Sequence, residues 1–228
     1  MQRLAIYDLD RTITSVPTWT PFLIHAAVTR APWRLLLAPV VIAAMLAYRV
    51  GRIDRRTLKQ GMHRLLVGPL PPDQAAAVAQ SFADRFVVRH IYPAARQRIA
   101  ADRAAGYRIV IATAAHRFYA SRIAAALGID DVVATEAAID AHGRVSSRIT
   151  GANCYGPDKL AMIQAWMAGE GLARDTTHVR FYSDHATDAP TFDWADEAIA
   201  VNPHARLRRL AAARGWPILE WRGSRARR

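Results

Sequence analysis

The stretch that decides the fold is LAIYDLDRT at residues 4–12. A continuous apolar run over residues 3–8 that ends in Asp8 is typical of a buried parallel strand. Sites in α/β sheets lie beyond the carboxyl ends of strands, where Asp8 and Asp10 can face the same crevice. One carboxylate is then a candidate nucleophile and the other a candidate acid and base, although two solvated aspartates that cap a helix are the structural alternative.

Two different patterns divide the rest of the chain. From Thr14 to about Tyr92 apolar residues recur at helical spacing, which predicts an all-helical insert without strands. After Pro93 strands and helices alternate, which predicts a parallel sheet with helices on both faces. The expected elements are helices at 94–105, 116–127, from Asp158 as cap to about 170, and from after 201 to 213; strands at 108–113, 132–133, 178–182, 198–201 and 218–219; and a hairpin or strand excursion at 137–150.

These patterns predict three regions. Residues 1–13 and 94–221 form an α/β core domain, residues 14–93 form a separate helical cap inserted after the first strand, and residues 222–228 form a basic, disordered tail.

Composition narrows the class of protein. The chain has 228 residues, of which 52% are hydrophobic and 22% charged, so wholesale disorder and a collagen-like repeat are excluded. Cys154 is the single cysteine, which excludes an intrachain disulfide and a zinc site built from cysteines. No secretory signal is visible in the sequence. We expect a cytoplasmic protein, with a peripheral position at the inner face of the membrane as an alternative.

The net charge of +12 is unevenly distributed. Residues 14–95 contain ten basic and three acidic residues, and residues 204–228 contain eight and one, whereas residues 96–203 are mildly acidic. Such fields attract anionic substrates, anionic lipid or nucleic acid, and a merely solvated surface is the simpler interpretation. No stacking aromatic residues alternate with the arginines of the tail, so no specific nucleic-acid partner is expected.

One uncharged segment has to be considered as a possible membrane-spanning helix. Leu35 to Tyr48 is uncharged over 14 residues between Arg34 and Arg49. It is shorter than the ~20 residues that a spanning helix needs, and Pro39 interrupts it. We therefore favour a buried core helix, followed by contact with an anionic membrane surface, and place a true span last.

Three further signals follow the first in an order that completes a phosphate site. Thr113 ends a predicted strand, where its hydroxyl can donate to a phosphate oxygen. Lys159 is one of only two lysines beside 29 arginines, which indicates a specific need for a compact charge. Asp184 and Asp188 follow another strand and suit a hard cation such as Mg²⁺. A polar strand end, a surface lysine and a capped helix start are the structural alternatives.

Together these residues resemble the four motifs of the haloacid dehalogenase superfamily. The helical insert resembles the C1-type cap of its subfamily IB, the phosphoserine-phosphatase-like branch. Residues 151–156, 201–203 and 214–217 resemble the same branch, so the similarity covers nearly the whole chain. The resemblance implies a Rossmann-like core and a Mg²⁺-dependent phosphomonoester hydrolase that forms an aspartyl-phosphate on a small phosphorylated metabolite.

The resemblance also implies a role for each matched residue. Asp8 is the nucleophile, Asp10 the acid and base, and Thr12 the residue that orients Asp10. The phosphate is bound by Thr113, Ala114 and Lys159, with Lys159 also counted as catalytic. The metal is held by Asp8, Asp184 and Asp10, the last through its backbone carbonyl, and Asp188 lies behind them to orient metal-bound water or Lys159.

Several alternatives for function remain open at this stage. Arg11 and Ser183 stand where the family often has smaller residues or glycine, and the family's substrate-binding Glu and Arg fall near Pro17 and Met62, which puts phosphoserine in doubt. The 35–48 segment resembles the corresponding part of phosphatidylglycerophosphate phosphatases, so a membrane-surface lipid phosphatase is an alternative. A non-catalytic phosphate-binding regulatory protein is another. The sequence does not give the natural substrate or the oligomeric state.

Overall fold

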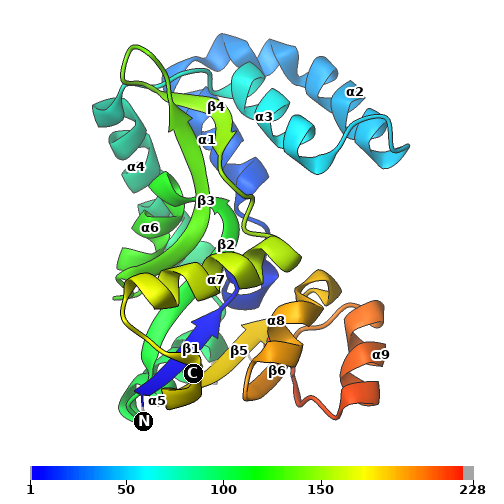
Figure 1. Cartoon of the computed structure of the whole chain (residues 1–228). Helices are drawn as coiled ribbons and strands as arrows, with labels where there is room; N and C mark the ends of the chain where they lie inside the picture. The colour runs from blue at the N-terminus through cyan, green and yellow to red at the C-terminus, as the bar shows by residue number, and fades with distance from the viewer. Residues whose placement is uncertain (1, 223–228) are drawn as a thin grey trace.

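The computed structural model describes residues 2–222, which are built around a seven-stranded sheet of order β4-β3-β2-β1-β5-β6-β7 (Figure 1). The strands are β1 (Gln2–Tyr7), β2 (Arg108–His116), β3 (Asp131–Ile139), β4 (Val145–Thr150), β5 (Thr177–Ser183), β6 (Glu197–Val201) and β7 (Ile218–Leu219). Neighbouring strands are parallel except for β3 and β4, which pair antiparallel. The predicted α/β fold is confirmed.

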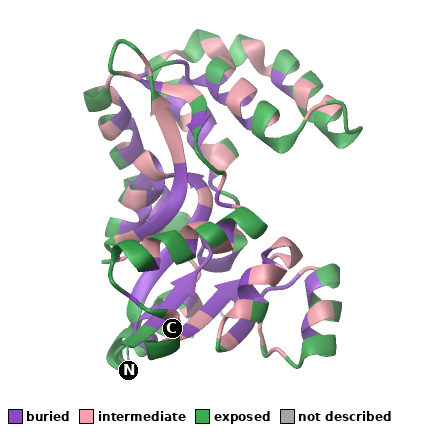
Figure 2. Cartoon of the chain, in the orientation of Figure 1, coloured by how far each residue is buried: buried purple, intermediate pink, exposed green. Residues whose placement is uncertain are grey.

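Helices cover both faces of the sheet, because residues on β1 alternate between two hydrophobic clusters. Ala5 and Tyr7 face α4 (Pro72–His90), α5 (Pro93–Ala104) and α6 (Arg117–Ala125). Leu4 and Ile6 face α7 (Pro157–Gly169), α8 (Ala189–Trp194) and α9 (Ala205–Arg214). Figure 2 shows these central strands as buried. A strand buried on both faces reads as a continuous apolar run, which is the pattern at residues 3–8.

The insert is helical throughout. It contains α1 (Trp19–Arg30), a 3₁₀ segment η2 (Pro32–Leu37), α2 (Ala38–Arg49), α3 (Arg55–Leu66) and α4. Residues 14–92 are all described and form no strand, apart from two isolated bridges, Thr14 with Ile91 and Leu70 with Val145. The first bridge sets the entry and exit of the insert side by side, so the insert starts and ends at the same edge of the core.

Three local predictions differ from the structure. β2 continues past Thr113 to His116, because β3 follows it across a register shift between these two residues. β3 is a long strand rather than a short one, and with β4 it forms the hairpin expected at 137–150. α7 begins after Gly156, and Asp158 lies inside its first turn instead of capping it. Of the expected disordered tail, residues 223–228 lie outside the described part of the chain.

The preferred interpretation of the 35–48 segment as a buried helix is wrong. In α2 only Val41 is buried, and Leu36 in η2 is 80% exposed. Pro32–Arg49 is long and apolar enough to pass a test for a membrane span, yet only 6% of it is buried. Figure 1 shows α2 at the edge of the molecule, away from the sheet.

Asp102 on α5 fixes the strands that carry the site. Its buried carboxylate accepts hydrogen bonds from the hydroxyls of Tyr7 (2.5 Å) and Tyr182 (2.8 Å), and pairs with Arg180 (2.5 Å). The two tyrosine rings stack with centroids 4.2 Å apart. Because Tyr7 ends β1 and Tyr182 lies near the end of β5, this network fixes the positions of both strand ends relative to α5.

We predict that Asp102→Asn lowers the free energy of unfolding by about 2–4 kcal/mol, because it leaves Arg180 without one buried anionic partner and the tyrosine hydroxyls with fewer acceptor sites. Urea unfolding followed by circular dichroism measures the effect. The matched control is Asp84→Asn on α4, where the aspartate is exposed and a change within about 0.5 kcal/mol is expected. Equal stability of the two variants would contradict a central role for the network.

Candidate active site

Asp8 lies where β1 leaves the sheet. Its backbone N–H donates to the carbonyl of Tyr182 (2.8 Å), which is the last such bond before the chain turns away. In the sheet, β1 lies between β2 and β5. After β1 the chain forms β2, β3 and β4 on one side of it, and then β5, β6 and β7 on the other side. Crevices form at the carboxyl ends of strands at such a switch in winding, and this is where Asp8 stands.

A π-type turn (η1, Leu9–Ile13) follows Asp8 and contains Asp10, and its backbone is kinked, with non-helical angles at Asp10 and Arg11. It directs Asp10 toward the insert, where its Oδ1 accepts a hydrogen bond from the N–H of Thr18 (2.8 Å). Arg11 has φ 61°, a left-handed conformation that is strained for a residue with a side chain. Asn202 donates to the Arg11 carbonyl (3.4 Å) and supports this turn, which places the 201–203 motif at the site.

A buried ion cluster joins three of the predicted residues. Lys159 Nζ donates to Asp8 Oδ1 (2.8 Å) and to Asp188 Oδ2 (2.6 Å). All three side chains are buried, and Ser183 Oγ donates to the same Asp188 oxygen (2.7 Å). The two carboxylates raise the pKa of the Lys159 ammonium although burial opposes this, so the lysine stays charged.

Asp184 adds a further carboxylate to this cluster. It is 4% exposed, and its nearest basic contact is His204 Nε2 at 3.4 Å. Burial, and next the charge of Asp8, raises the pKa of Asp184 to about 8. Burial likewise raises the pKa of Asp8, although Lys159 opposes the shift. Three buried carboxylates around one ammonium leave an excess of negative charge, which favours a bound cation.

The residues at this point fit a divalent metal ion. Asp8 and Asp184 supply oxygen ligands, which hard cations prefer. Within residues 2–222 no group of three or more His, Cys, Asp or Glu side chains is arranged to hold a metal, and the Asp10 carboxylate accepts the Thr18 N–H. The third ligand expected from the sequence is the backbone carbonyl of Asp10, which such a side-chain group does not include.

Of the two threonines predicted for the site, Thr12 contacts a different carboxylate from the one expected. Thr113 is buried, and its hydroxyl accepts the N–H of Ala115 (3.1 Å), which leaves its hydrogen available to a ligand. Thr12 was expected to orient Asp10. Its hydroxyl instead donates to Asp8 Oδ2 (3.3 Å), because the π-type turn carries Asp10 away from it. Thr12 therefore contacts the carboxylate on the opposite side from Lys159.

A cavity of about 300 Å³ brings the predicted residues together, with the exception of Thr12. Its lining includes Asp8, Asp10, Thr113, Ala114, Lys159, Asp184 and Asp188. It also includes Arg11, which the sequence marks as a departure from the family pattern, and residues that the sequence did not indicate: Arg55, Tyr155, His185, Thr187 and His204. His185 lies between Asp184 and Asp188 in the sequence, and that adjacency is a signal that could have identified it.

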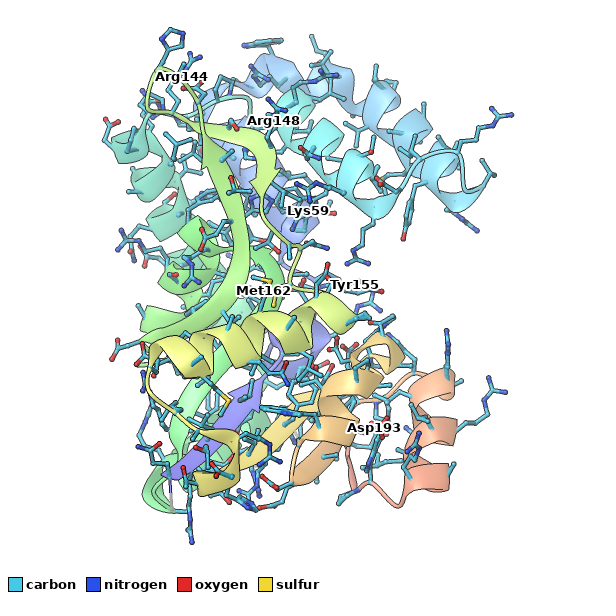
Figure 3. All side chains as sticks on the ribbon, viewed as in Figure 1. Lys59, Arg144, Arg148, Tyr155, Met162 and Asp193 are labelled. Carbon is cyan, nitrogen blue, oxygen red and sulfur yellow. The ribbon has the colours of Figure 1, made fainter. Side chains whose placement is uncertain are left out.

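A second cavity of about 230 Å³ adjoins the first, since Asp10, Arg55 and Ala114 line both. Its remaining walls come mainly from the insert, namely Trp19, Thr20, Met45, Tyr48, Leu58, Lys59, Met62 and Ala115. Lys59 is 8% exposed; its Nζ donates to the Ala114 carbonyl and to Asn153 Oδ1 (3.3 Å). Figure 3 shows Lys59 extending from α3 toward the loop of Tyr155.

The model of the haloacid dehalogenase-like hydrolase family matches residues 5–193. The chain therefore belongs to this family, and the predicted family resemblance is confirmed. The expectation of an enzyme, a phosphatase-type hydrolase, is confirmed as well.

Individual relatives span the whole chain. The histidinol-phosphatase of Neisseria meningitidis serogroup C (strain 8013) is 24% identical over 97% of this chain and 100% of that protein. The solved structure of a protein of unknown function from Bordetella pertussis Tohama I has TM-score 0.84 and 30% identity, and the match covers 96% of this chain and 98% of that one. Several other curated relatives are matched over only about half of their length.

A more distant solved structure is a phosphoserine phosphatase described as a phospho-aspartyl intermediate analogue. It has TM-score 0.63 and 18% identity, with 97% of this chain and 94% of that chain covered. At this identity the likeness shows the shared fold and no more.

We predict that, in the presence of a chelator, stability falls as pH rises from about 4 to about 8. Folded Asp184 and Asp8 retain protons that the unfolded chain has already released, so unfolding becomes more favourable by at most about 1.4 kcal/mol per pH unit for each group. Urea unfolding across this range measures the slope. Asp184→Asn should reduce it, whereas Asp193→Asn, in an exposed pair with Arg214, should not. An unchanged slope in Asp184→Asn would contradict the assignment.

Proposed function

We propose that this enzyme hydrolyses phosphate monoesters through an aspartyl-phosphate on Asp8, with Mg²⁺ as cofactor and a small phosphorylated metabolite as substrate. The observation that carries the proposal is the buried contact of Lys159 with Asp8 and Asp188 at the carboxyl ends of β1 and β5. A non-catalytic phosphate-binding role would not require Asp10 to line the same cavity as this cluster.

In the first half-reaction an Asp8 oxygen attacks phosphorus, and the bond between phosphorus and the ester oxygen breaks. Lys159 and Thr12 hold the two Asp8 oxygens in place. The hydroxyl of Thr113, the backbone of Ala114 and the Lys159 ammonium would bind the phosphate oxygens as their charge shifts.

Asp10 would supply the proton for the leaving alkoxide. Burial raises the pKa of Asp10, although the Thr18 N–H opposes the shift, and a raised pKa favours a proton donor. The Thr18 contact occupies Oδ1, so the proton belongs on Oδ2. In the second half-reaction Asp10 takes a proton from the water that attacks the phosphorus, and the bond between phosphorus and the Asp8 oxygen breaks, which releases inorganic phosphate and restores the Asp8 carboxylate.

Asp8, Asp184 and the Asp10 carbonyl would hold Mg²⁺. When bound, the ion offsets the repulsion between the anionic Asp8 and the anionic phosphate. Asp188 contacts Lys159 directly and would act by positioning its ammonium.

The second cavity would receive the leaving group, because Asp10 lines both cavities. Arg55 and Lys59 are the basic residues of this lining, with burial lowering the pKa of Lys59 to about 7; Asp10 is its single carboxylate, and the other walls are mostly apolar. This charge pattern supports a leaving group with a carboxylate or an apolar group. Phosphoserine, which carries an ammonium group beside a carboxylate, and histidinol phosphate, which carries an ammonium group and no carboxylate, are suggested by the names of relatives and remain alternatives.

We predict that Asp8→Asn lowers phosphate release at least about 1,000-fold, because the amide cannot form the ester intermediate. The assay is a phosphate-release screen over phosphorylated metabolites and lipids with Mg²⁺, repeated with a chelator, which should abolish turnover. Asp193→Asn on α8, labelled in Figure 3, is the matched control and should retain wild-type turnover. Wild-type turnover by the Asp8→Asn variant would refute the assignment of Asp8 as the nucleophile.

We also predict that Arg55→Gln and Lys59→Met each raise KM for 3-phosphoglycerate at least about 10-fold, with kcat changed less than about threefold, since the lost contact is to the leaving group. Phosphoethanolamine, which carries an ammonium group, should be a poor substrate whose KM does not rise. Arg55 is exposed, so its variant tests the contact without disturbing the core. A preference of the wild type for phosphoethanolamine would overturn this specificity.

A further inference from the structure

The exposed apolar side chains of the enzyme are concentrated in one segment. Nine of the thirteen large hydrophobic residues exposed within residues 2–222 fall between positions 33 and 50. They are Trp33, Leu35, Leu36, Val40, Ile42, Met45, Leu46, Tyr48 and Val50. Single exposed apolar residues are ordinary, whereas a contiguous group of this size marks a binding surface.

This segment is apolar on all sides. From Ala38 to Tyr48, α2 contains no charged residue, and only Val41 is buried against the rest of the insert. A helix that is hydrophobic all round normally lies inside a protein or in a membrane. Here it lies at the edge of the molecule, and Figure 2 shows α2 as mostly exposed and intermediate.

The surroundings of the segment are basic. Within residues 14–72 the single acidic residue is Asp54, which accepts the Thr57 N–H (2.6 Å) as the cap of α3. The same range contains eight basic residues, and Arg30, Arg49 and Arg52, at or just beyond the ends of the apolar segment, are exposed. An apolar surface with a basic rim matches the chemistry of an anionic bilayer surface.

The segment is held in a fixed position. Arg34 in η2 donates to the carbonyls of Arg64 (3.0 Å) and Leu65 (2.9 Å) at the end of α3. Since α3 also carries Lys59, the apolar surface and the second cavity are attached to the same helix. Met45 and Tyr48 belong to both the surface and the cavity wall.

We propose that η2 and α2 form a membrane-binding surface that attaches the enzyme to an anionic lipid bilayer, with α2 lying in the interface. Pro32–Arg49 is long enough to pass a test for a span, but Arg34 near its start is hydrogen-bonded to the Arg64 and Leu65 carbonyls of α3, which keeps the segment along the insert, so it lies on the bilayer and does not cross it. A second copy of the chain is disfavoured as the partner, because a two-fold contact would bring two basic rims together.

The proposal is independent of the phosphatase reaction and is tested by binding alone. The full chain is sedimented with vesicles of phosphatidylcholine containing 40% phosphatidylglycerol, and with vesicles of phosphatidylcholine only. We expect binding to the anionic vesicles at low salt that is at least about 10-fold tighter than to the neutral ones and weakens as salt rises.

Two sets of variants separate the apolar and the charged contributions. Leu36→Glu with Leu46→Glu should weaken vesicle binding at least about 10-fold, as should Arg49→Glu with Arg52→Glu. The matched control is Val88→Glu, because Val88 is 83% exposed on α4, outside the segment. Thermal unfolding followed by circular dichroism confirms that every variant is folded.

The outcomes that overturn the proposal are specific. One is the absence of binding to anionic vesicles at low salt. Another is equal binding by the wild type and the Leu36→Glu, Leu46→Glu variant, which would mean that the apolar surface takes no part. A third is a dimer, seen by sedimentation equilibrium without lipid, that the same variant dissociates, because a second copy would then cover the surface.

Discussion

The buried ammonium of Lys159 between Asp8 and Asp188 is the interaction on which the rest of the site depends. Carboxylates taken out of water are costly unless a charge of opposite sign accompanies them. The lysine reaches them because α7 begins directly after Gly156, whose φ of 60° and ψ of −135° suit glycine alone. The conformation of the loop before α7 therefore places one positive charge, the Lys159 ammonium, at the ends of β1 and β5.

Much of this site could be predicted from the sequence because a parallel sheet brings its strand ends together. Asp8 and Asp184 each follow a strand and Thr113 lies near the end of one, so their convergence needed only the order of elements. The partner of Thr12 could not be predicted, since it depends on a π-type turn that local spacing does not reveal. Lys59 and Arg55 were missed because α3 reaches the site through tertiary packing, and its sequence carries no motif for that packing.

The segment at residues 35–48 shows what composition does not determine. Because the segment has no charged side chain, its apolar side chains are predicted to be buried away from water. Whether the apolar contact comes from the protein's own core or from another surface depends on where the helix is held. Arg34 ties η2 to α3 at the edge of the insert, and no other element of the described chain covers the outer side of α2.

The strand ends of the core and the insert carry charges of opposite sign near the site. The strand ends hold an excess of carboxylates, so a phosphate dianion approaching Asp8 meets repulsion there. The insert supplies the opposite field, with Arg55 and Lys59 at the cavity shared by both parts. Under the proposed function, the insert would draw in an anionic substrate, which would become reactive where Lys159 and a bound cation neutralise the strand ends. The same basic insert faces outward around α2, so one charge excess can serve both the substrate and a lipid surface.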